Sequence, residues 1–153
     1  MSERIRLADL DEQMQGAIAG TRQRVADLHA ELPRWGLVVW TAGNVSERVV
    51  VDRGDGPVKT DLFVIKPSGV SYDELTADTM VTCTLDGEKI DDGTPASLTP
   101  SSDTAAHAYV YRHRDDVGGV VHTHSPYATA WAARREPIPC ALTMMGDEFG
   151  GDI

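Results

Sequence analysis

Two histidines stand one residue apart at the end of an apolar run, in the segment GGVVHTHSPYATAWA. On a β-strand, side chains at positions i and i+2 point to the same face, so His122 and His124 could converge on one cation. Neutral imidazole is a good ligand for zinc and similar divalent metals. The alternative is that one ring packs and the other hydrogen-bonds a backbone carbonyl. The pair alone leaves both interpretations open, because a catalytic zinc normally has three protein ligands.

A carboxylate and a further histidine stand before this pair in the sequence. Asp103 is expected at the start of a helix, from where it could approach a metal from outside the strand. His107 follows four residues later and therefore shares a helical face with Asp103. We interpret His107 as a structural hydrogen-bonding residue of that helix rather than as a ligand.

Three turns have residue types suited to holding an anion. They are TAGNVS (41–46), KPSG (66–69) and PSSD (100–103). The last places two hydroxyl groups at a helix N-terminus, where free N–H groups and the helix dipole attract negative charge. Turns and helix caps also use these residues for purely structural reasons. Their occurrence beside the histidine pair favours a phosphorylated ligand, which needs both a phosphate site and an electrophile.

Composition limits the classes of protein that need to be considered. The chain has 153 residues, 41% of them hydrophobic, and a net charge of -10, which is typical of one globular domain and unfavourable for binding nucleic acid. We find no secretory signal and no run long enough to span a membrane. Cys83 and Cys140 form no CxxC motif, and we interpret both as buried thiols of a protein in the reducing cytoplasm.

The chain alternates short apolar runs with helical patterns, which predicts a mixed sheet covered by helices. Pro33 is expected to end the first helix. We expect helices over residues 8–31, from Ser102 or Asp103 to Arg114, and after Ser125-Pro126. We expect strands over 36–40, 45–51, 62–65, 80–85, 117–124 and 138–143, with a hairpin at Asp86-Gly87 and a return strand EKI, and a solvated loop over 52–61.

The ordered segments GLVVWTAGNVS, VIKPSGVSYDELTADTMV, PSSDTAAHAYVYR, GGVVHTHSPYATAWA and GDEFGG resemble the class II aldolase/adducin family. Within the family they are most similar to the L-ribulose-5-phosphate 4-epimerases. The resemblance implies an α/β fold, a three-layer α/β/α sandwich with a central mixed, largely antiparallel sheet, formed by residues 1–153 as one domain. It also implies a homotetramer with active sites at subunit boundaries, without a nucleic-acid or membrane partner.

The resemblance assigns roles to individual positions. His122 and His124 would bind a divalent metal, most simply Zn²⁺, with Asp103 beside it to tune or complete its coordination. Asp147 matches a catalytic acid/base, so Asp103 and Asp147 are the candidate catalytic carboxylates. The phosphate site of the family falls on Asn44, Lys66, Ser68, Gly69, Ser101 and Ser102.

The chain also departs from the family pattern. Residues 52–61 look like an insertion in a loop. The third metal-binding histidine of the family, and a tyrosine from the neighbouring subunit that acts as the second acid/base, match no position of this sequence, so we expect the chain to lack the family's C-terminal portion.

The implied reaction is metal-dependent interconversion of L-ribulose 5-phosphate and D-xylulose 5-phosphate, by cleavage and re-formation of the C3–C4 bond. The alternatives are a sugar-phosphate aldolase of the L-fuculose-phosphate type, a related dehydratase, and a non-catalytic assembly domain as in adducin. In the family, aldolases carry Glu where the epimerases carry Asp, so Asp103 favours the epimerase. Retention of both His122 and His124 speaks against the assembly domain.

Overall fold

The computed structural model describes residues 4–153 and contains two compact units, Met1–Thr123 and His124–Ile153. The first unit holds a long helix, a four-stranded sheet, a second helix and three short 3-10 turns. The second unit holds two short helices. The expectation of a single domain over 1–153 stays a proposal.

The long helix α1 (Glu12–Arg34) begins where the sequence places a good cap. The carboxylate of Asp11 accepts a hydrogen bond from the N–H of Met14 at 2.8 Å, which satisfies one of the free donors of the first turn. Its buried residues recur every three or four positions, with Ala26 directly after Val25, and form the stripe that faces the sheet: Ile18, Thr21, Val25, Ala26, His29 and Leu32. The helix continues one residue past Pro33, which lies in its last turn.

The sheet has the order β3-β2-β1-β4, and every pair of neighbouring strands is antiparallel. The strands are β1 (Asn44–Asp52), β2 (Pro57–Ile65), β3 (Val81–Thr84) and β4 (Gly119–His122). Strand β4 pairs with the first half of β1, and the register sets Asn44 opposite His122. This pairing brings the TAGN turn and the end of the GGVVH run to the same end of the sheet.

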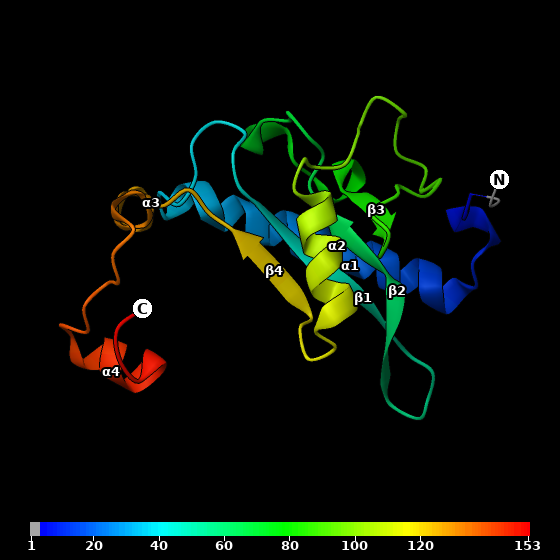
Figure 1. Cartoon of the computed structure of the whole chain (residues 1–153). Helices are drawn as coiled ribbons and strands as arrows, with labels where there is room; N and C mark the ends of the chain where they lie inside the picture. Colours follow the sequence, from blue (N-terminus) through cyan, green and yellow to red (C-terminus); the bar gives the residue numbers. More distant parts are fainter. Residues whose placement is uncertain (1–3) are drawn as a thin grey trace. The chain divides into compact units, whose positions relative to one another are not determined.

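The two faces of the sheet are covered by different helices. In β2, Leu62 and Val64 belong to the core under α1, whereas Phe63 and Ile65 belong to the core under α2 (Thr104–His113). This is the period-2 alternation of a strand buried on both faces. Figure 1 shows α1 behind the sheet and α2 in front of it. The predicted α/β class and the three layers are confirmed, with an antiparallel sheet.

Several predicted elements differ from the structure. Residues 36–40 form no strand, although they are apolar. Strand β2 starts at Pro57 inside the predicted loop 52–61, because Asp52 pairs with Pro57 and the two strands form a hairpin. The EKI segment gives only an isolated bridge between Cys83 and Lys89 instead of a strand. The turn at Gly87, with φ of +84°, is present as predicted.

The second unit contains α3 (Pro126–Arg134) and α4 (Thr143–Phe149). Helix α3 starts with Pro126 at its first position, as predicted. The predicted strand over 138–143 is wrong: Ile138 instead exchanges two backbone hydrogen bonds with Ile153, and helix α4 begins at Thr143. Cys83 is buried as expected, but Cys140 is exposed, so its interpretation as a buried thiol is also wrong.

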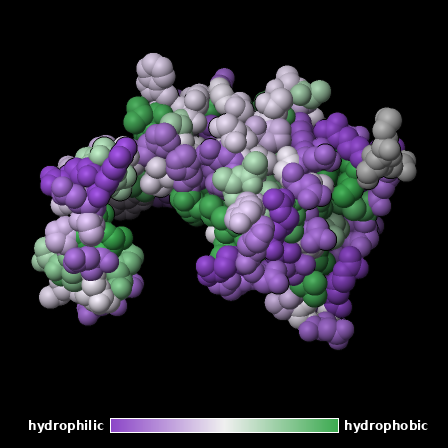
Figure 2. Space-filling model, in the orientation of Figure 1, coloured by the Kyte–Doolittle hydropathy of each residue, from purple (hydrophilic) through white to green (hydrophobic). Residues whose placement is uncertain are grey.

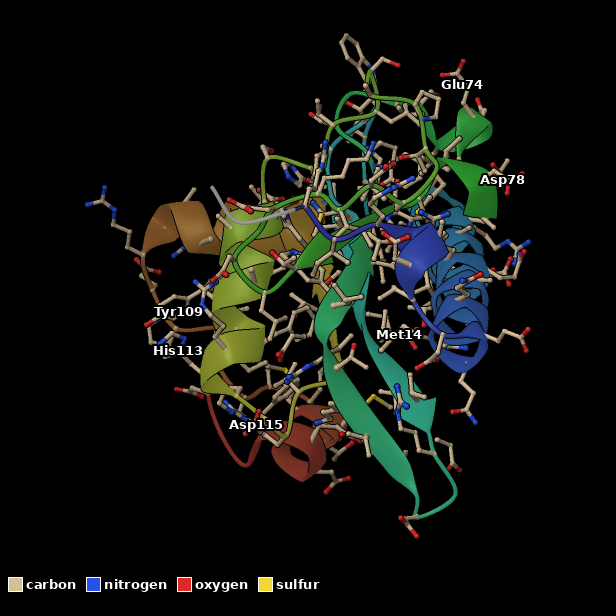
Figure 3. The ribbon with its side chains drawn as sticks, turned by 90° about the vertical axis from the view of Figure 1, so that its right-hand side faces the viewer. Met14, Glu74, Asp78, Tyr109, His113 and Asp115 are labelled. Carbon is tan, nitrogen blue, oxygen red and sulfur yellow. The ribbon has the colours of Figure 1, made fainter. Side chains whose placement is uncertain are left out.

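The surface of the first unit is mainly hydrophilic in the view of Figure 2. Figure 2 shows that hydrophilic residues cover most of this face of the unit, with smaller apolar areas between them. In the turned view of Figure 3 the strands lie between α2 and α1, and Tyr109 and His113 lie together on α2.

None of the helices within residues 4–153 has the length and apolar composition needed to span a membrane.

Candidate functional site

The candidate site is built where three elements of the first unit meet. Strand β1 supplies Asn44, the N-terminus of α2 supplies Asp103, and the end of β4 supplies His122. The Oδ2 atom of Asp103 accepts hydrogen bonds from Asn44 Nδ2 at 2.7 Å and from His122 Nδ1 at 2.6 Å. One carboxylate oxygen therefore links a residue of a candidate phosphate turn to a candidate metal ligand.

Asp103 is held as a carboxylate by these contacts. Partial burial raises the pKa of Asp103, but the hydrogen bonds from Asn44 and His122 outweigh it, and the pKa lies below its ordinary value of 3.8. The side chain of Asp103 makes no capping hydrogen bond to α2. It is directed to β1 and β4 instead, so its position at the helix start serves the site rather than the helix.

Asn44 is almost completely buried, and its side chain holds Ser101 and Asp103 in place by hydrogen bonds. Its Nδ2 donates to the hydroxyl of Ser101 at 3.2 Å as well as to Asp103. Because the carboxylate needs a donor, the amide orientation is fixed, and Oδ1 is left as a buried acceptor to which no described residue donates a hydrogen bond. Both donor hydrogens of Asn44 are used within the site, and its predicted contact with a phosphate stays a prediction.

The KPSG and PSSD turns lie side by side. Pro67 and Pro100 form an isolated antiparallel bridge, the N–H of Ser101 donates to the carbonyl of Lys66, and the N–H of Ser68 donates to that of Thr99. Ser68, Gly69 and Ser102 are exposed, and Ser101 is half-buried. The structure thus brings these four candidate phosphate-site residues into two adjoining turns, next to Asn44.

Lys66 differs from the other candidates of these turns because its side chain is buried. It is 2% exposed, and its ammonium group donates to the carbonyl of Thr41 at 2.9 Å. Burial lowers the pKa of Lys66. The charge is therefore placed under the TAGN turn, where it holds the backbone, while its predicted contact with a phosphate stays a prediction.

Sequence reasoning missed a buried polar network behind the site. The hydroxyl of Ser46 lies 2.7 Å from Nδ1 of His107 and 2.7 Å from the hydroxyl of Tyr111. The hydrogen-bonding role predicted for His107 is confirmed, although its partner is on β1 rather than on its own helix. The available signal was that Ser46 lies two residues after Asn44 and so shares its face of β1.

A second missed residue, His29 of α1, fixes the start of β1. Its Nδ1 lies 2.6 Å from the carbonyl of Val25 and its Nε2 accepts the N–H of Val45 at 3.0 Å, so the neutral ring carries its proton on Nδ1. Burial lowers the pKa of His29 to about 4. No local pattern indicates a polar partner for this residue, because the partner on β1 is a backbone group distant in the chain.

His124 and Asp147 belong to the second unit. Both are exposed, and Asp147 lies within α4. Over residues 4–153 no group of three or more His, Cys, Asp or Glu side chains has the arrangement of a complete metal site. The predicted roles of His124 and Asp147 therefore stay predictions that rest on the sequence.

The donor set of the first unit suits a divalent metal. Metal-binding histidines commonly donate their second ring N–H to a carboxylate, which fixes the tautomer and orients the ring. The hydrogen bond between His122 Nδ1 and Asp103 has this form, and it leaves Nε2 as the nitrogen by which His122 would bind a metal. An imidazole supported by a carboxylate is a ligand suited to zinc or a similar cation.

Several known proteins are similar to this chain in sequence. The chain is 46% identical over 132 residues to "L-ribulose-5-phosphate 4-epimerase UlaF" of Salmonella paratyphi C (strain RKS4594), and equally to that of Salmonella choleraesuis (strain SC-B67). The match covers 86% of this chain and 53% of the relative in each case, so the chain spans about half the length of these curated relatives.

Solved structures agree on the fold. An L-fuculose 1-phosphate aldolase matches with a TM-score of 0.68 and 28% identity, over 83% of this chain and 54% of the other. The L-fuculose-1-phosphate aldolase from Thermus Thermophilus matches with a TM-score of 0.58 and 26% identity, over 83% of this chain and 59% of the other. Residues 23–153 match the family described as Class II Aldolase and Adducin N-terminal domain, and with that extent of agreement the chain belongs to the class II aldolase and adducin family.

Proposed function

We propose that the protein is a divalent-metal-dependent epimerase that interconverts L-ribulose 5-phosphate and D-xylulose 5-phosphate. The observation that carries the proposal is the pair of hydrogen bonds to Asp103, which joins Asn44, beside the paired turns, to His122. The similarity to L-ribulose-5-phosphate 4-epimerases over 86% of the chain supports the same reaction.

The phosphate of the substrate would be bound by the adjoining KPSG (66–69) and PSSD (100–103) turns. Ser68, Gly69 and Ser102 are exposed, and Ser101 is half-buried. The serine hydroxyls and the backbone N–H groups of Gly69 and Ser102 are of the kinds that commonly donate to phosphate, whereas the N–H groups of Ser68 and Ser101 hold the two turns together. Asn44 would keep Ser101 in place, and Lys66, held below the turn, would add positive charge. This arrangement would retain a phosphorylated fragment while the rest of the substrate reacts.

The metal, proposed to be Zn²⁺, would be bound by His122 and His124, with Asp103 beside them. A bound divalent metal supplies Lewis acidity that stabilises negative charge on substrate oxygens. Asp103 would keep the ring of His122 in the tautomer that has a lone pair on Nε2. The role of His124 rests on its spacing from His122 and on the family resemblance.

The reaction needs one proton-transfer group on each face of the aldehyde intermediate. Deprotonation of the C4 hydroxyl accompanies cleavage of the C3–C4 bond, which gives a dihydroxyacetone-derived fragment and glycolaldehyde phosphate. Rotation of the aldehyde and re-formation of the bond, with protonation of the new C4 hydroxyl, inverts C4. We propose Asp147 for one face and, following the resemblance, a tyrosine of a neighbouring subunit for the other. A cytoplasmic homotetramer is part of this proposal.

A sugar-phosphate aldolase is the second candidate, because the L-fuculose 1-phosphate aldolase matches the fold with a TM-score of 0.68. It would use the same bond cleavage and release both fragments. The family pattern of Asp rather than Glu at position 103 favours the epimerase.

The test is to incubate the protein, expressed from its native gene and loaded with Zn²⁺, with L-ribulose 5-phosphate. The epimerase produces D-xylulose 5-phosphate, whereas an aldolase produces dihydroxyacetone and glycolaldehyde phosphate. His122→Ala should abolish either activity, and His113→Ala, an exposed residue of α2, serves as the matched control. Absence of both sets of products from the zinc-loaded protein would overturn the proposal.

A further inference from the structure

Three successive backbone carbonyls of the TAGN turn lie within hydrogen-bond distance of two side-chain donors, Lys66, which is buried, and Tyr72, which is half-buried. The ammonium group of Lys66 donates to the carbonyl of Thr41 at 2.9 Å. The hydroxyl of Tyr72, the first residue of the 3-10 turn η2 (Tyr72–Glu74), lies within hydrogen-bond distance of the next two carbonyls, 2.9 Å from that of Ala42 and 3.1 Å from that of Gly43. These two donors restrain the backbone of the three residues that precede β1, with the single Tyr72 proton shared between the carbonyls of Ala42 and Gly43.

The two side chains that hold the turn also contact each other. The ammonium nitrogen of Lys66 lies 5.4 Å from the centroid of the Tyr72 ring, within the range of a cation–π interaction. The hydroxyl of Tyr72 is protonated and can donate at neutral pH, and burial raises its pKa further, to about 12. Lys66, which follows β2, and Tyr72, which belongs to η2, therefore support the TAGN turn together.

The turn is confined on its other sides as well. Gly43 has φ of +76°, and a Cβ atom there would lie 2.5 Å from Val38 Cγ1 and 2.9 Å from the carbonyl oxygen of His122. Beyond Asn44, the N–H of Val45 is bound by His29, whose ring centroid lies 6.1 Å from that of Tyr72. Asn44 is therefore bracketed by fixed backbone groups before and after it.

We propose that Tyr72 is a positioning residue that, by holding the carbonyls of Ala42 and Gly43, sets the direction in which Asn44 donates to Asp103 and Ser101. A displaced turn would misplace Nδ2 of Asn44, and with it the carboxylate that orients His122. The consequence for phosphate binding rests on the proposed function, whereas the conformation of the turn does not.

The variant Tyr72→Phe tests this because it keeps the ring and removes only the hydroxyl. Removing the one proton that the Tyr72 hydroxyl can donate to these carbonyls shifts the equilibrium between the held and the displaced turn by about tenfold. Amide hydrogen exchange at residues 43–45 of the full protein should therefore accelerate about tenfold, with exchange in β2 and β3 unchanged, and the Kd for inorganic phosphate should rise by a similar factor. Tyr109→Phe removes the hydroxyl of an exposed tyrosine on α2 and should change neither quantity.

A double-mutant cycle separates positioning from general stability. If Tyr72 acts through Asn44, Tyr72→Phe should leave the phosphate Kd unchanged in an Asn44→Ala background, whereas independent effects would add. Additive effects on Kd, or unchanged exchange at residues 43–45, would overturn the proposal. A wild-type protein that binds no phosphate would count against the proposed function instead, and hydrogen exchange alone would then decide whether Tyr72 sets the turn.

Discussion

Asp103 and His122 are 19 residues apart in the sequence, and their side chains are joined by a hydrogen bond of 2.6 Å. The same carboxylate oxygen binds Asn44, which is paired with His122 across β1 and β4. Three elements therefore converge on one atom, and their relative positions are fixed by sheet register on one side and by this carboxylate on the other. A site with these constraints is preorganised before any ligand arrives.

Gly43 is predicted to tolerate no side chain. Gly43→Ala would strain a positive φ and place a Cβ 2.5 Å from Val38 Cγ1 and 2.9 Å from the carbonyl of His122. We expect the free energy of unfolding, measured with urea, to fall by about 3 kcal/mol, the sum of backbone strain and overpacking. The proposed phosphate binding should also be lost, because the turn must move.

Gly54 is the matched control for this substitution. It also has positive φ, +96°, but nothing lies within 4 Å of a Cβ built there. Gly54→Ala should cost only the backbone strain, about 1 kcal/mol, and leave phosphate binding intact. Equal losses of stability for the two variants would show that the close approach of Gly43 to β4 does not contribute to the change in the free energy of unfolding.

His29 should make the stability depend on pH in the weakly acidic range. Its pKa is about 4 in the folded chain against an ordinary value of 6.5, so between these values the unfolded chain binds the additional proton. The contribution of His29 to the free energy of unfolding is therefore fully present above pH 6.5, and it is lost as the pH drops toward 4. The loss attributable to this residue is about 3 kcal/mol.

Urea unfolding of His29→Leu over the same pH range measures this contribution. The variant should be less stable at pH 7, because the N–H of Val45 loses its acceptor, and its stability should depend less steeply on pH than that of the wild type. His113→Gln, on the surface of α2, should retain the wild-type slope. A wild-type slope in His29→Leu would contradict the assignment.

The buried ion pair between Arg22 of α1 and Asp92 should matter far more than the surface pairs. The two groups are 2.7 Å apart, and Asp92 also accepts hydrogen bonds from Thr82 and Thr94. Asp92→Asn should lower the free energy of unfolding by about 3 kcal/mol, because it leaves a mostly buried guanidinium without its counter-charge. In the exposed pair of Arg34 and Glu31, Glu31→Gln should cost less than about 1 kcal/mol. Comparable losses in thermal unfolding would refute this difference.

The sequence predicted the elements whose signal is local. Helix α1 has an apolar stripe and α3 has Pro126 at its first position, so both were found close to their observed ranges, whereas the apolar run 62–65 indicated only the last part of β2. The run at 36–40 failed because it has the composition of a strand without a partner strand to pair with. Strand β2 extended into the expected loop because pairing with β1, a tertiary effect, outweighs the polar composition of 57–61.

The candidate site shows the same difference between residues with a local sequence signal and residues that depend on tertiary contacts. Asn44, Ser101, Asp103 and His122 were proposed from motifs, and the structure brings them together. Tyr72 and His29 were not found, because they act on backbone groups that lie far away in the sequence. Lys66 was proposed for its charge, but the burial of that charge under the turn depends on packing that no motif encodes.

The most direct test of the account is the zinc affinity of the protein, measured by competition with a chromophoric chelator. Loss of a carboxylate that orients a metal-binding histidine lowers metal affinity by about 10- to 100-fold, so Asp103→Asn should weaken zinc binding by that factor. His122→Ala should remove it, and Asp55→Asn, on the exposed β1–β2 turn, should leave it unchanged. Zinc binding of wild-type strength in both Asp103→Asn and His122→Ala would contradict the central claim that these residues form a metal site.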